Sequence, residues 1–276
     1  MSKFVGKSLA RMKRQGRSIV AITAYDLFTA SIARDAGVDL VLVGDSLGNV
    51  VQGADTTIPV TLDDIVYHSR MVVRAVDGRI PVFADMPFGT FKISAEDTVR
   101  NAVRLFKDSG CDGVKLEGAT PDTLEAIEKL IAIGIPVMGH TGFLPQTVHA
   151  SGGFKYRGKT PSDREIIISE AESLENAGCC AIVLECVAHG VAAEITKRID
   201  APTIGIGSGP GCDGQILVIN DLLGMYPQPP SFVSPYSDLL ERGTEALTAW
   251  SQDVRRGNYP RRGEEFADTP AVKEEA

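Results

Sequence analysis

The sequence predicts an α/β fold, a (β/α)8 TIM barrel in a single domain. Its 276 residues are typical of one such barrel. Short apolar runs rich in β-branched residues alternate with helical patterns, which indicates parallel strands joined by right-handed crossovers. Eight runs predict strands: 18–24, 39–45, 80–86, 113–117, 135–140, 181–186, 202–207 and 215–219. A doubly wound open sheet is the alternative, but no nucleotide-binding glycine cluster follows the first run.

Start and stop signals for helices lie between these runs. Ser and Thr open helices because their side chains accept hydrogen bonds from free amides of the first turn. Pro fits the first turn because no amide hydrogen is needed there, and Gly ends helices because it adopts the left-handed backbone of the C-terminal cap. The predicted helices are Phe28–Ala36 before Gly37, Thr61–Val76, one from Ser94 to Gly110, one with Pro121 in its first turn, and one that opens with a capping box at Ser162–Glu165 and ends at Gly178.

One domain accounts for nearly the whole chain. The barrel is expected to occupy residues 1–260, with a basic amphipathic helix near the N-terminus closing its bottom. The charged segment 261–276 has few apolar residues, so it is predicted to be a mobile C-terminal tail.

Composition excludes several classes of partner. The formal net charge is −8, which argues against binding to nucleic acid or to an anionic membrane surface. No apolar run approaches 18 residues, so no membrane span is expected. Five cysteines, an odd number without a Cys-x-x-Cys pair, indicate a reducing cytoplasm rather than a disulfide framework.

Five polar residues stand at the C-terminal ends of predicted strands, where TIM barrels carry their active sites: Asp45, Asp85, Glu117, His140 and Glu185. The three carboxylates at 45, 85 and 117 are hard oxygen donors that suit Mg²⁺. Each one alone could instead cap the following helix. Because whole strand–helix units separate them, we expect them to converge on one site.

Three of these strand ends suggest specific chemistry. Lys115 shares a strand side with Glu117, so it either pairs with that carboxylate or binds an anionic substrate. His140 is either a structural histidine or part of the site. Glu185 lies between Leu184 and Cys186, and such apolar surroundings favour a carboxylate that accepts a proton.

Two long segments are expected on the same face, at Ser46–Thr61 and Thr141–Pro161. The second contains the basic cluster Lys155–Lys159, either a solvated loop or a contact for an anionic ligand. A formal Gly-x-Gly-x-x-Gly at Gly209, Gly211 and Gly214 is discounted as a dinucleotide site, because no long helix follows it.

Over roughly residues 3–260 the chain closely resembles the ketopantoate hydroxymethyltransferase family. The resemblance rests on several dense motifs. They are Thr23-Ala24-Tyr25-Asp26, Leu42-Val43-Gly44-Asp45-Ser46-Leu47-Gly48, Val51-Gln52-Gly53, Ala84-Asp85-Met86-Pro87-Phe88, Val114-Lys115-Leu116-Glu117-Gly118, Gly139-His140-Thr141-Gly142, Leu184-Glu185-Cys186 and Gly205-Ile206-Gly207-Ser208-Gly209.

The resemblance implies transfer of a hydroxymethyl group from 5,10-methylenetetrahydrofolate to 3-methyl-2-oxobutanoate, in pantothenate biosynthesis, by a homo-oligomer that is often decameric. It implies Mg²⁺ or a similar divalent metal at Asp45, Asp85 and Glu117, and Glu185 as the catalytic base. It also implies that Asp45, Ser46, Asp85 and Lys115 contact the keto acid, with His140 nearby.

Two other functions stay open on the sequence alone. One is a Mg²⁺-dependent carbon–carbon lyase or mutase of the phosphoenolpyruvate/isocitrate-lyase group, although the Lys-Lys-Cys-Gly-His loop common in its lyases is absent here. The other is a barrel that only binds. For the transferase, we further expect Lys155–Lys159 to contact the anionic tail of the folate.

Overall fold

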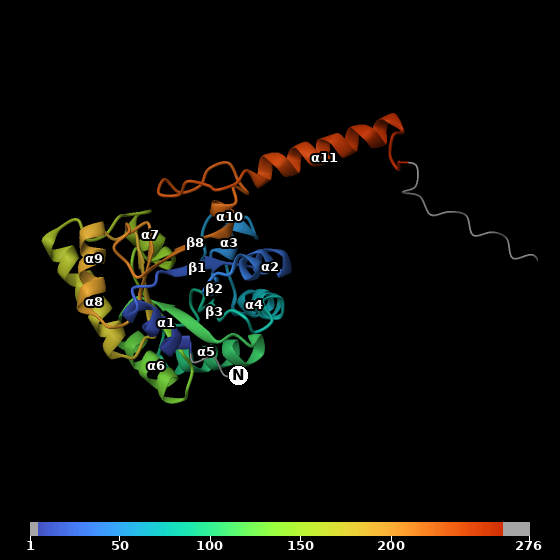
Figure 1. The fold of residues 1–276 in the computed structure, drawn as a ribbon. Helices are drawn as coiled ribbons and strands as arrows, with labels where there is room; N and C mark the ends of the chain where they lie inside the picture. The colour runs from blue at the N-terminus through green and yellow to red at the C-terminus, as the bar shows by residue number, and fades with distance from the viewer. Residues whose placement is uncertain (1–4, 262–276) are drawn as a thin grey trace, which may run out of the picture. The chain divides into compact units, whose positions relative to one another are not determined.

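A computed structural model describes residues 5–261 of the chain (Figure 1). Backbone contacts divide it into two compact units, one ending at Ile219 and one beginning at Asn220. The first unit contains the closed barrel that the sequence predicts. The expected tail at 261–276 lies outside the described residues except for Arg261.

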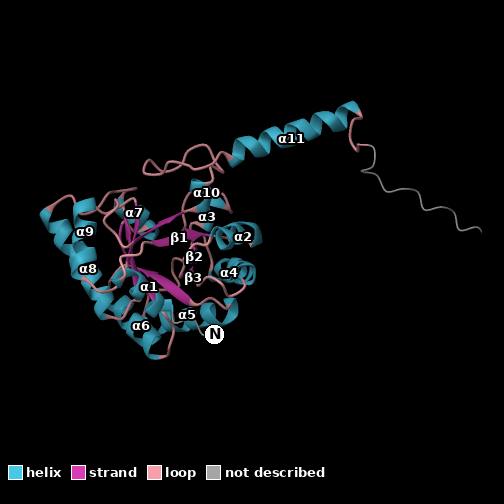
Figure 2. Ribbon diagram, viewed as in Figure 1, coloured by secondary structure: helices cyan, strands magenta, loops and turns pink. Residues whose placement is uncertain are grey.

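Eight parallel strands close the barrel in chain order, and β8 pairs back onto β1. Helices surround the strands (Figure 2). This arrangement confirms the predicted fold class, and each strand lies within a few residues of its predicted place. The strands are β1 Ile19–Thr23, β2 Leu40–Val43, β3 Val82–Asp85, β4 Gly113–Glu117, β5 Val137–Gly142, β6 Ala181–Glu185, β7 Thr203–Ile206 and β8 Gly214–Leu217.

Helices follow most strands of the first unit. They are α1 Val5–Arg14, α2 Leu27–Ala36, α3 Leu47–Val50, α4 Leu62–Val76, α5 Ala95–Ser109, α6 Pro121–Ala132, the 3₁₀ helix η1 Pro145–Thr147, α7 Val148–Ser151, α8 Pro161–Asn176 and α9 His189–Arg198. The short helices α3, η1 and α7 lie within the two segments that were predicted as long loops.

The predicted start of α8 is wrong by two residues. Thr160, not Ser162, is the N-cap, and its hydroxyl accepts a hydrogen bond from the Asp163 amide at 3.2 Å. Pro161 explains the shift, because proline has no amide hydrogen and fits the first helical turn, where none is needed. The predicted helix starts at Thr61 and Ser94 are confirmed as N-caps, and Pro121 lies in the first turn of α6 as predicted.

The second unit contains the end of α10, Ile219–Leu222, and the long helix α11, Leu239–Arg256. None of the residues of α11 is buried. Four large apolar side chains at helical spacing are exposed on it: Leu240, Leu247, Trp250 and Val254. In the part of the chain that the structure describes, no helix is long and apolar enough to cross a membrane.

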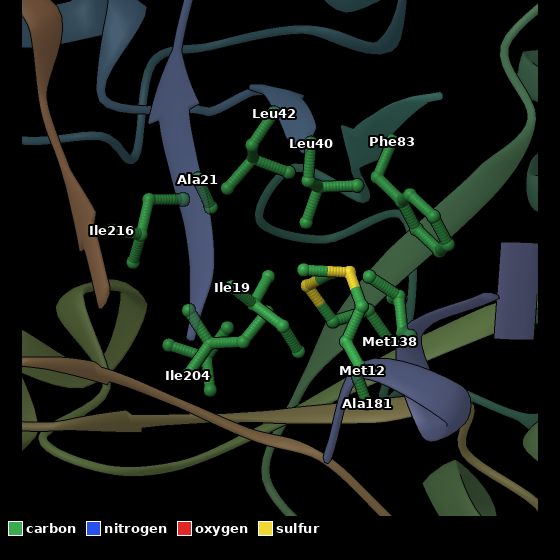
Figure 3. Close-up of a cluster of buried hydrophobic side chains, with 12 residues drawn as sticks. Met12, Ile19, Ala21, Leu40, Leu42, Phe83, Met138, Ala181, Ile204 and Ile216 are labelled. Carbon is green, nitrogen blue, oxygen red and sulfur yellow. The ribbon is translucent and has the colours of Figure 1, made fainter. Parts of the chain in front are cut away.

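Apolar side chains fill the lower interior of the barrel (Figure 3). Phe83, Met138 and Val183 belong to this cluster, from β3, β5 and β6. Met12 of α1 reaches the same cluster from below, in keeping with a helix that closes the barrel bottom. Gly113 of β4 makes room for the Phe83 ring, since a Cβ there would lie 2.4 Å from it.

The upper interior is polar because side chains alternate along each strand with a period of two. Two residues after Phe83, Met138 and Val183 come Asp85, His140 and Glu185, so these polar side chains face the same interior one layer higher. The apolar layer therefore lies beneath a polar layer at the C-terminal ends of the strands.

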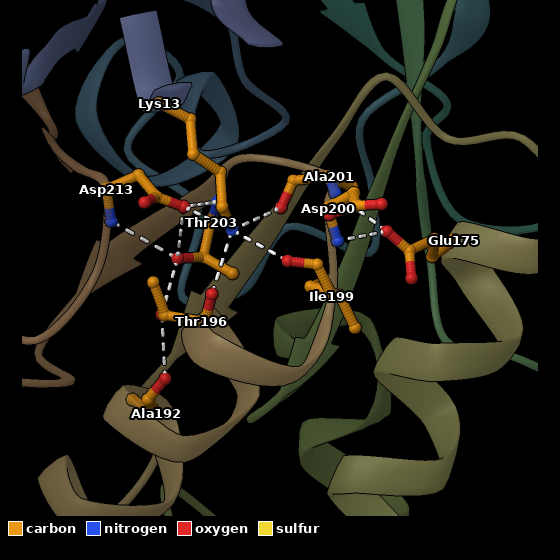
Figure 4. A network of polar contacts seen from close by, with 9 residues as sticks. All are labelled: Lys13, Glu175, Ala192, Thr196, Ile199, Asp200, Ala201, Thr203 and Asp213. Carbon is orange, nitrogen blue, oxygen red and sulfur yellow. Dashed lines mark hydrogen bonds and ion pairs between the residues drawn. The ribbon is translucent and has the colours of Figure 1, made fainter. Parts of the chain in front are cut away.

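Lys13 of α1 ties this helix to α9 and to the segment before β8 (Figure 4). Its ammonium group donates to the carbonyls of Thr196, Ile199 and Ala201 at 2.9, 2.9 and 3.2 Å, and lies 3.0 Å from Asp213. These carbonyls lie in and just after the last turn of α9, where no amide of the helix is available to them. Lys13 thus joins α1, α9 and the segment before β8.

We predict that Lys13→Met lowers the free energy of unfolding by about 2–4 kcal/mol, because it leaves a carboxylate and several carbonyls without their cation. Urea unfolding measures this loss. Lys107→Met, at an exposed position of α5, is the matched control and should change stability by less than about 0.5 kcal/mol. Equal stability of the two variants would contradict the proposal that the contacts of Lys13 stabilise the barrel.

Candidate active site

The polar residues predicted at the strand ends meet at the barrel mouth. Strand register sets which of them are neighbours, since Asp85 pairs with Lys115, and Glu117 pairs with His140. One strand further round the barrel, Gly142 pairs with Glu185. The structure therefore brings together side chains from β3 to β6 on one face.

Asp85 and Lys115 form a buried ion pair, with Nζ 2.9 Å from Oδ1. The other oxygen of Asp85, Oδ2, accepts a hydrogen bond from the Asp45 amide at 3.0 Å. Burial alone would lower the pKa of Lys115, but Asp85, Glu117 and Asp45 outweigh it and raise that pKa. The sequence left an ion pair with Glu117 or contact with an anionic substrate open for Lys115, but its direct side-chain partner is Asp85.

Gly44 allows Ser46 to approach this pair closely. A Cβ at Gly44 would lie 2.7 Å from Oγ of Ser46 and 3.5 Å from Oδ2 of Asp85. The Ser46 hydroxyl is also held at 2.8 Å by the phenol of Tyr25, which is buried after β1. Ser46 precedes α3 without capping it through its side chain, so its hydroxyl is available to the cavity.

Asp45 is a buried carboxyl among other carboxyls. Burial, followed by the nearby charges of Asp85 and Glu117, raises its pKa well above the ordinary value. Its Oδ2 accepts a hydrogen bond from the side-chain amide of Gln146 at 2.8 Å. Asp45 is not a helix cap, which was the structural alternative for it. Without further positive charge, burial and these neighbours favour its protonated form.

His140 lies between two carboxylates. Its Nδ1 is 3.5 Å from Oε1 of Glu117, and its Nε2 is 3.3 Å from Oε2 of Glu185. Burial and the Lys115 ammonium lower the pKa of His140, but the two carboxylates outweigh them and raise it. The ring thus connects the buried Glu117 with Glu185, whose side chain is 17 % exposed.

The donor set at the mouth fits a divalent cation. Among residues 5–261 no three acidic, histidine or cysteine side chains already form a closed ligand cluster. Yet Asp45, Asp85 and Glu117 are buried near one another, and Oε2 of Glu117 has no hydrogen-bond partner among the described residues. A cation here would bind that oxygen and would stabilise the ionised form of Asp45.

The sequence did not indicate three residues of this site. Gln146 in η1 contacts Asp45, and Tyr25 contacts Ser46. Lys92, in the segment between β3 and α5, has a left-handed backbone with φ of 66°. Burial lowers the pKa of Lys92 and the Lys115 ammonium lowers it further, although Glu117 opposes them. All three residues lie outside the strands. Only Tyr25 falls within a motif of the family resemblance, Thr23-Ala24-Tyr25-Asp26, and that motif was the one signal that could have pointed to it.

The basic segment Lys155–Lys159 lies beside β6. Arg157 pairs with Asp163 at 2.6 Å and donates to the carbonyl of Gly142 at 3.1 Å. Its backbone bridges the chain just after Glu185, with the Arg157 amide 2.9 Å from the Cys186 carbonyl. Arg157 is therefore a tether, whereas Lys155 and Lys159 are the exposed cations of this segment.

Comparison with known proteins supports an enzyme of one-carbon transfer. A family model described as ketopantoate hydroxymethyltransferase matches residues 3–262. A relative from Acetivibrio thermocellus, named 3-methyl-2-oxobutanoate hydroxymethyltransferase, is 48 % identical over 94 % of this chain and 91 % of its own. One of the same name from Carboxydothermus hydrogenoformans is 45 % identical over 99 % of both chains.

Solved structures with the same fold are more distant. Phosphonopyruvate hydrolase in complex with oxalate and Mg²⁺ has a TM-score of 0.61 at 14 % identity and covers 98 % of this chain and 93 % of its own. 2,3-Dimethylmalate lyase, of the PEP mutase/isocitrate lyase superfamily, has a TM-score of 0.59 at 19 % identity and covers 96 % of this chain and 92 % of its own. These similarities show the fold alone. From the family match and the relatives, we conclude that the chain is an enzyme of the ketopantoate hydroxymethyltransferase family.

Proposed function

We propose that the enzyme transfers a hydroxymethyl group from 5,10-methylenetetrahydrofolate to 3-methyl-2-oxobutanoate and releases 2-dehydropantoate. The observation that carries the proposal is the place of Glu185. Its carboxylate is partly exposed in the mouth, 3.3 Å from His140, on the same face as the buried pair of Lys115 and Asp85. A carboxylate suited to act as a base and a buried cation suited to bind an anion thus lie at the same end of the barrel.

The keto acid would be bound by the residues around Asp85. The Lys115 ammonium supplies positive charge for its carboxylate, and the Ser46 hydroxyl, held by Tyr25, supplies a hydrogen bond. Asp45, Asp85 and Glu117 would hold Mg²⁺ or a similar ion, in line with the Mg²⁺ named for phosphonopyruvate hydrolase. When bound, this ion supplies a Lewis acid that stabilises negative charge on the keto acid.

Glu185 would then remove the proton from C3 of the keto acid. His140, between Glu185 and Glu117, holds the base in place and stabilises its negative charge. The carbanion at C3 forms a bond with the methylene carbon, both bonds from that carbon to the folate nitrogens break, and tetrahydrofolate leaves. One water supplies the oxygen of the new hydroxymethyl group, and the two nitrogens take up one proton of that water and the proton removed from C3. Exposed Lys155 and Lys159 would face the anionic tail of the folate.

We place this enzyme in the cytoplasm. The proposal is supported by its cysteines, since all five are free and three of them, Cys111, Cys179 and Cys186, are buried. Free buried thiols are typical of a reducing compartment. Fractionation of cells that produce the chain would test the location, and recovery outside the cytoplasmic fraction would contradict it.

We predict that Glu185→Gln slows exchange of the C3 proton of 3-methyl-2-oxobutanoate with deuterated water by about 10²–10⁴-fold, because the base is gone while the shape is kept. Proton NMR measures this reaction, which needs no folate. Glu172→Gln, on the outer helix α8, is the matched control and should exchange like the wild type. Wild-type exchange in Glu185→Gln would move the role of base to another residue, with His140 the first to test.

We predict that Asp45→Asn weakens binding of Mg²⁺ by about tenfold or more, since one anionic oxygen is lost. Because burial and its neighbours already favour a neutral Asp45, the variant should be at least as stable as the wild type without metal. Thermal unfolding over a series of Mg²⁺ concentrations measures both effects without an activity assay. An unchanged Mg²⁺ dependence would remove Asp45 from the metal site.

We also propose that the chain forms a homo-oligomer. Leu240, Leu247, Trp250 and Val254 of α11 are each 44–62 % exposed, although the Tyr259 ring contacts Trp250. Exposed apolar surfaces of this kind mark interaction sites. Sedimentation equilibrium should therefore give a mass several times the 29.5 kDa of one chain, and Leu247→Glu should lower it. A wild-type mass of 29.5 kDa would refute self-association.

A further inference from the structure

Three aromatic rings form a continuous contact from the barrel mouth to the surface. We call Phe143, Phe154 and Tyr156 the aromatic ladder. The ring centroids of Phe143 and Phe154 are 4.7 Å apart, and those of Phe154 and Tyr156 are 5.6 Å apart in an edge-to-face contact. Both separations lie in the range where aromatic rings attract one another.

The ladder begins at the backbone of the proposed base. The Phe143 amide donates to the carbonyl of Glu185 at 2.8 Å, directly after β5. The segment that carries Phe154 and Tyr156 is fixed beside β6 by Arg157, whose amide and carbonyl both bond the backbone after Glu185. The ladder is therefore anchored to the backbone at the C-terminal end of β6, the strand that ends at Glu185.

Exposure rises along the ladder and positive charge lies at its outer end. Phe143 is 7 % exposed, whereas Phe154 is 51 % exposed. The ammonium of Lys159 lies 5.3 Å from the centroid of the Tyr156 ring, and Lys155 lies between Phe154 and Tyr156 in sequence. An apolar ring surface that is open to solvent and bordered by cations suits a flat ring with an anionic tail.

We propose that the aromatic ladder is the surface on which the folate co-substrate stacks its ring system. The inference rests on the proposed function, because it requires a co-substrate that brings an electrophilic carbon to the keto acid beside Glu185. The inner end of the ladder is bonded to the backbone of Glu185, and Lys159 lies over the ring at its outer end. A rigid aromatic surface orients such a ligand at a small entropic cost.

The test compares Phe154→Ala with Phe154→Tyr, which keeps a ring at the same position. Phe154→Ala should raise the KM for methylenetetrahydrofolate by about three- to tenfold or more, and Phe154→Tyr should restore it. The same ratio should appear in the binding of 5-formyltetrahydrofolate, a reduced folate that cannot transfer its carbon, measured by titration calorimetry. Folate-free exchange of the C3 proton should stay at the wild-type rate in both variants.

Ile133→Ala is the matched control. Ile133 is 59 % exposed, and it lies between α6 and β5, at the opposite end of the barrel. This variant should leave the KM, the folate affinity and the exchange rate unchanged. An equal loss in Ile133→Ala would assign the effect of Phe154→Ala to a general loss of exposed apolar surface and overturn the inference.

The outcomes separate this inference from the function on which it rests. A wild-type enzyme that exchanges the C3 proton but makes no product with the folate would refute the proposed function. Product formation with unchanged folate KM in Phe154→Ala would refute the ladder alone. A Phe154→Ala variant that changes only its sedimenting mass would identify the ladder as a contact between copies of the chain and would also refute the inference.

Discussion

The buried ion pair between Asp85 and Lys115 is the interaction on which the mouth of the barrel depends. Both oxygens of Asp85 are occupied, one by the Lys115 ammonium and one by the Asp45 amide. The pair therefore fixes the ends of β3 and β4 and the chain after β2 relative to one another. Because it is buried, removal of one partner alone would leave an uncompensated charge, which costs about 3–5 kcal/mol. The proposed binding of the keto acid and the stability of the barrel mouth therefore both depend on the ion pair between Asp85 and Lys115.

The pair also accounts for the charge balance around it. The carboxyl groups of Asp45, Asp85 and Glu117 are buried, and one lysine, Lys115, directly contacts one of them, Asp85. His140 lies beside Glu117. The excess of negative charge raises the pKa of Asp45 and leaves an oxygen of Glu117 without a partner. This excess of negative charge is suited to a cation, and the bound cation would in turn attract an anionic substrate. Binding of the cation and of the substrate would thus both follow from the excess of buried carboxylates over lysine.

Much of this arrangement was readable in the sequence, for a physical reason. Buried parallel strands are apolar, so a polar residue at the end of such a run is conspicuous, as at Asp85 and Glu185. The contact partners were less readable, because they depend on register between strands: Lys115 neighbours Asp85 across β3 and β4, although Glu117 is nearer in sequence. Gln146 and Lys92 come from irregular segments, which carry no periodic signal. At the start of α8, the capping pattern at Ser162 was misleading, because Pro161 fits the first helical turn and the N-cap is Thr160.

The contacts of Lys13 with α9 and with the segment before β8 have a consequence for synthesis of the chain. Lys13 is made early, but its partner carbonyl at Ala201 follows 188 residues later. While the ribosome works through β2 to β6, this ammonium has none of those partners, and β1 has no β8 beside it. The barrel can close only after nearly the whole first unit has emerged. A nascent chain that stops before Asp213 would therefore expose the open edge of β1, which is the surface that chaperones bind and that aggregation uses.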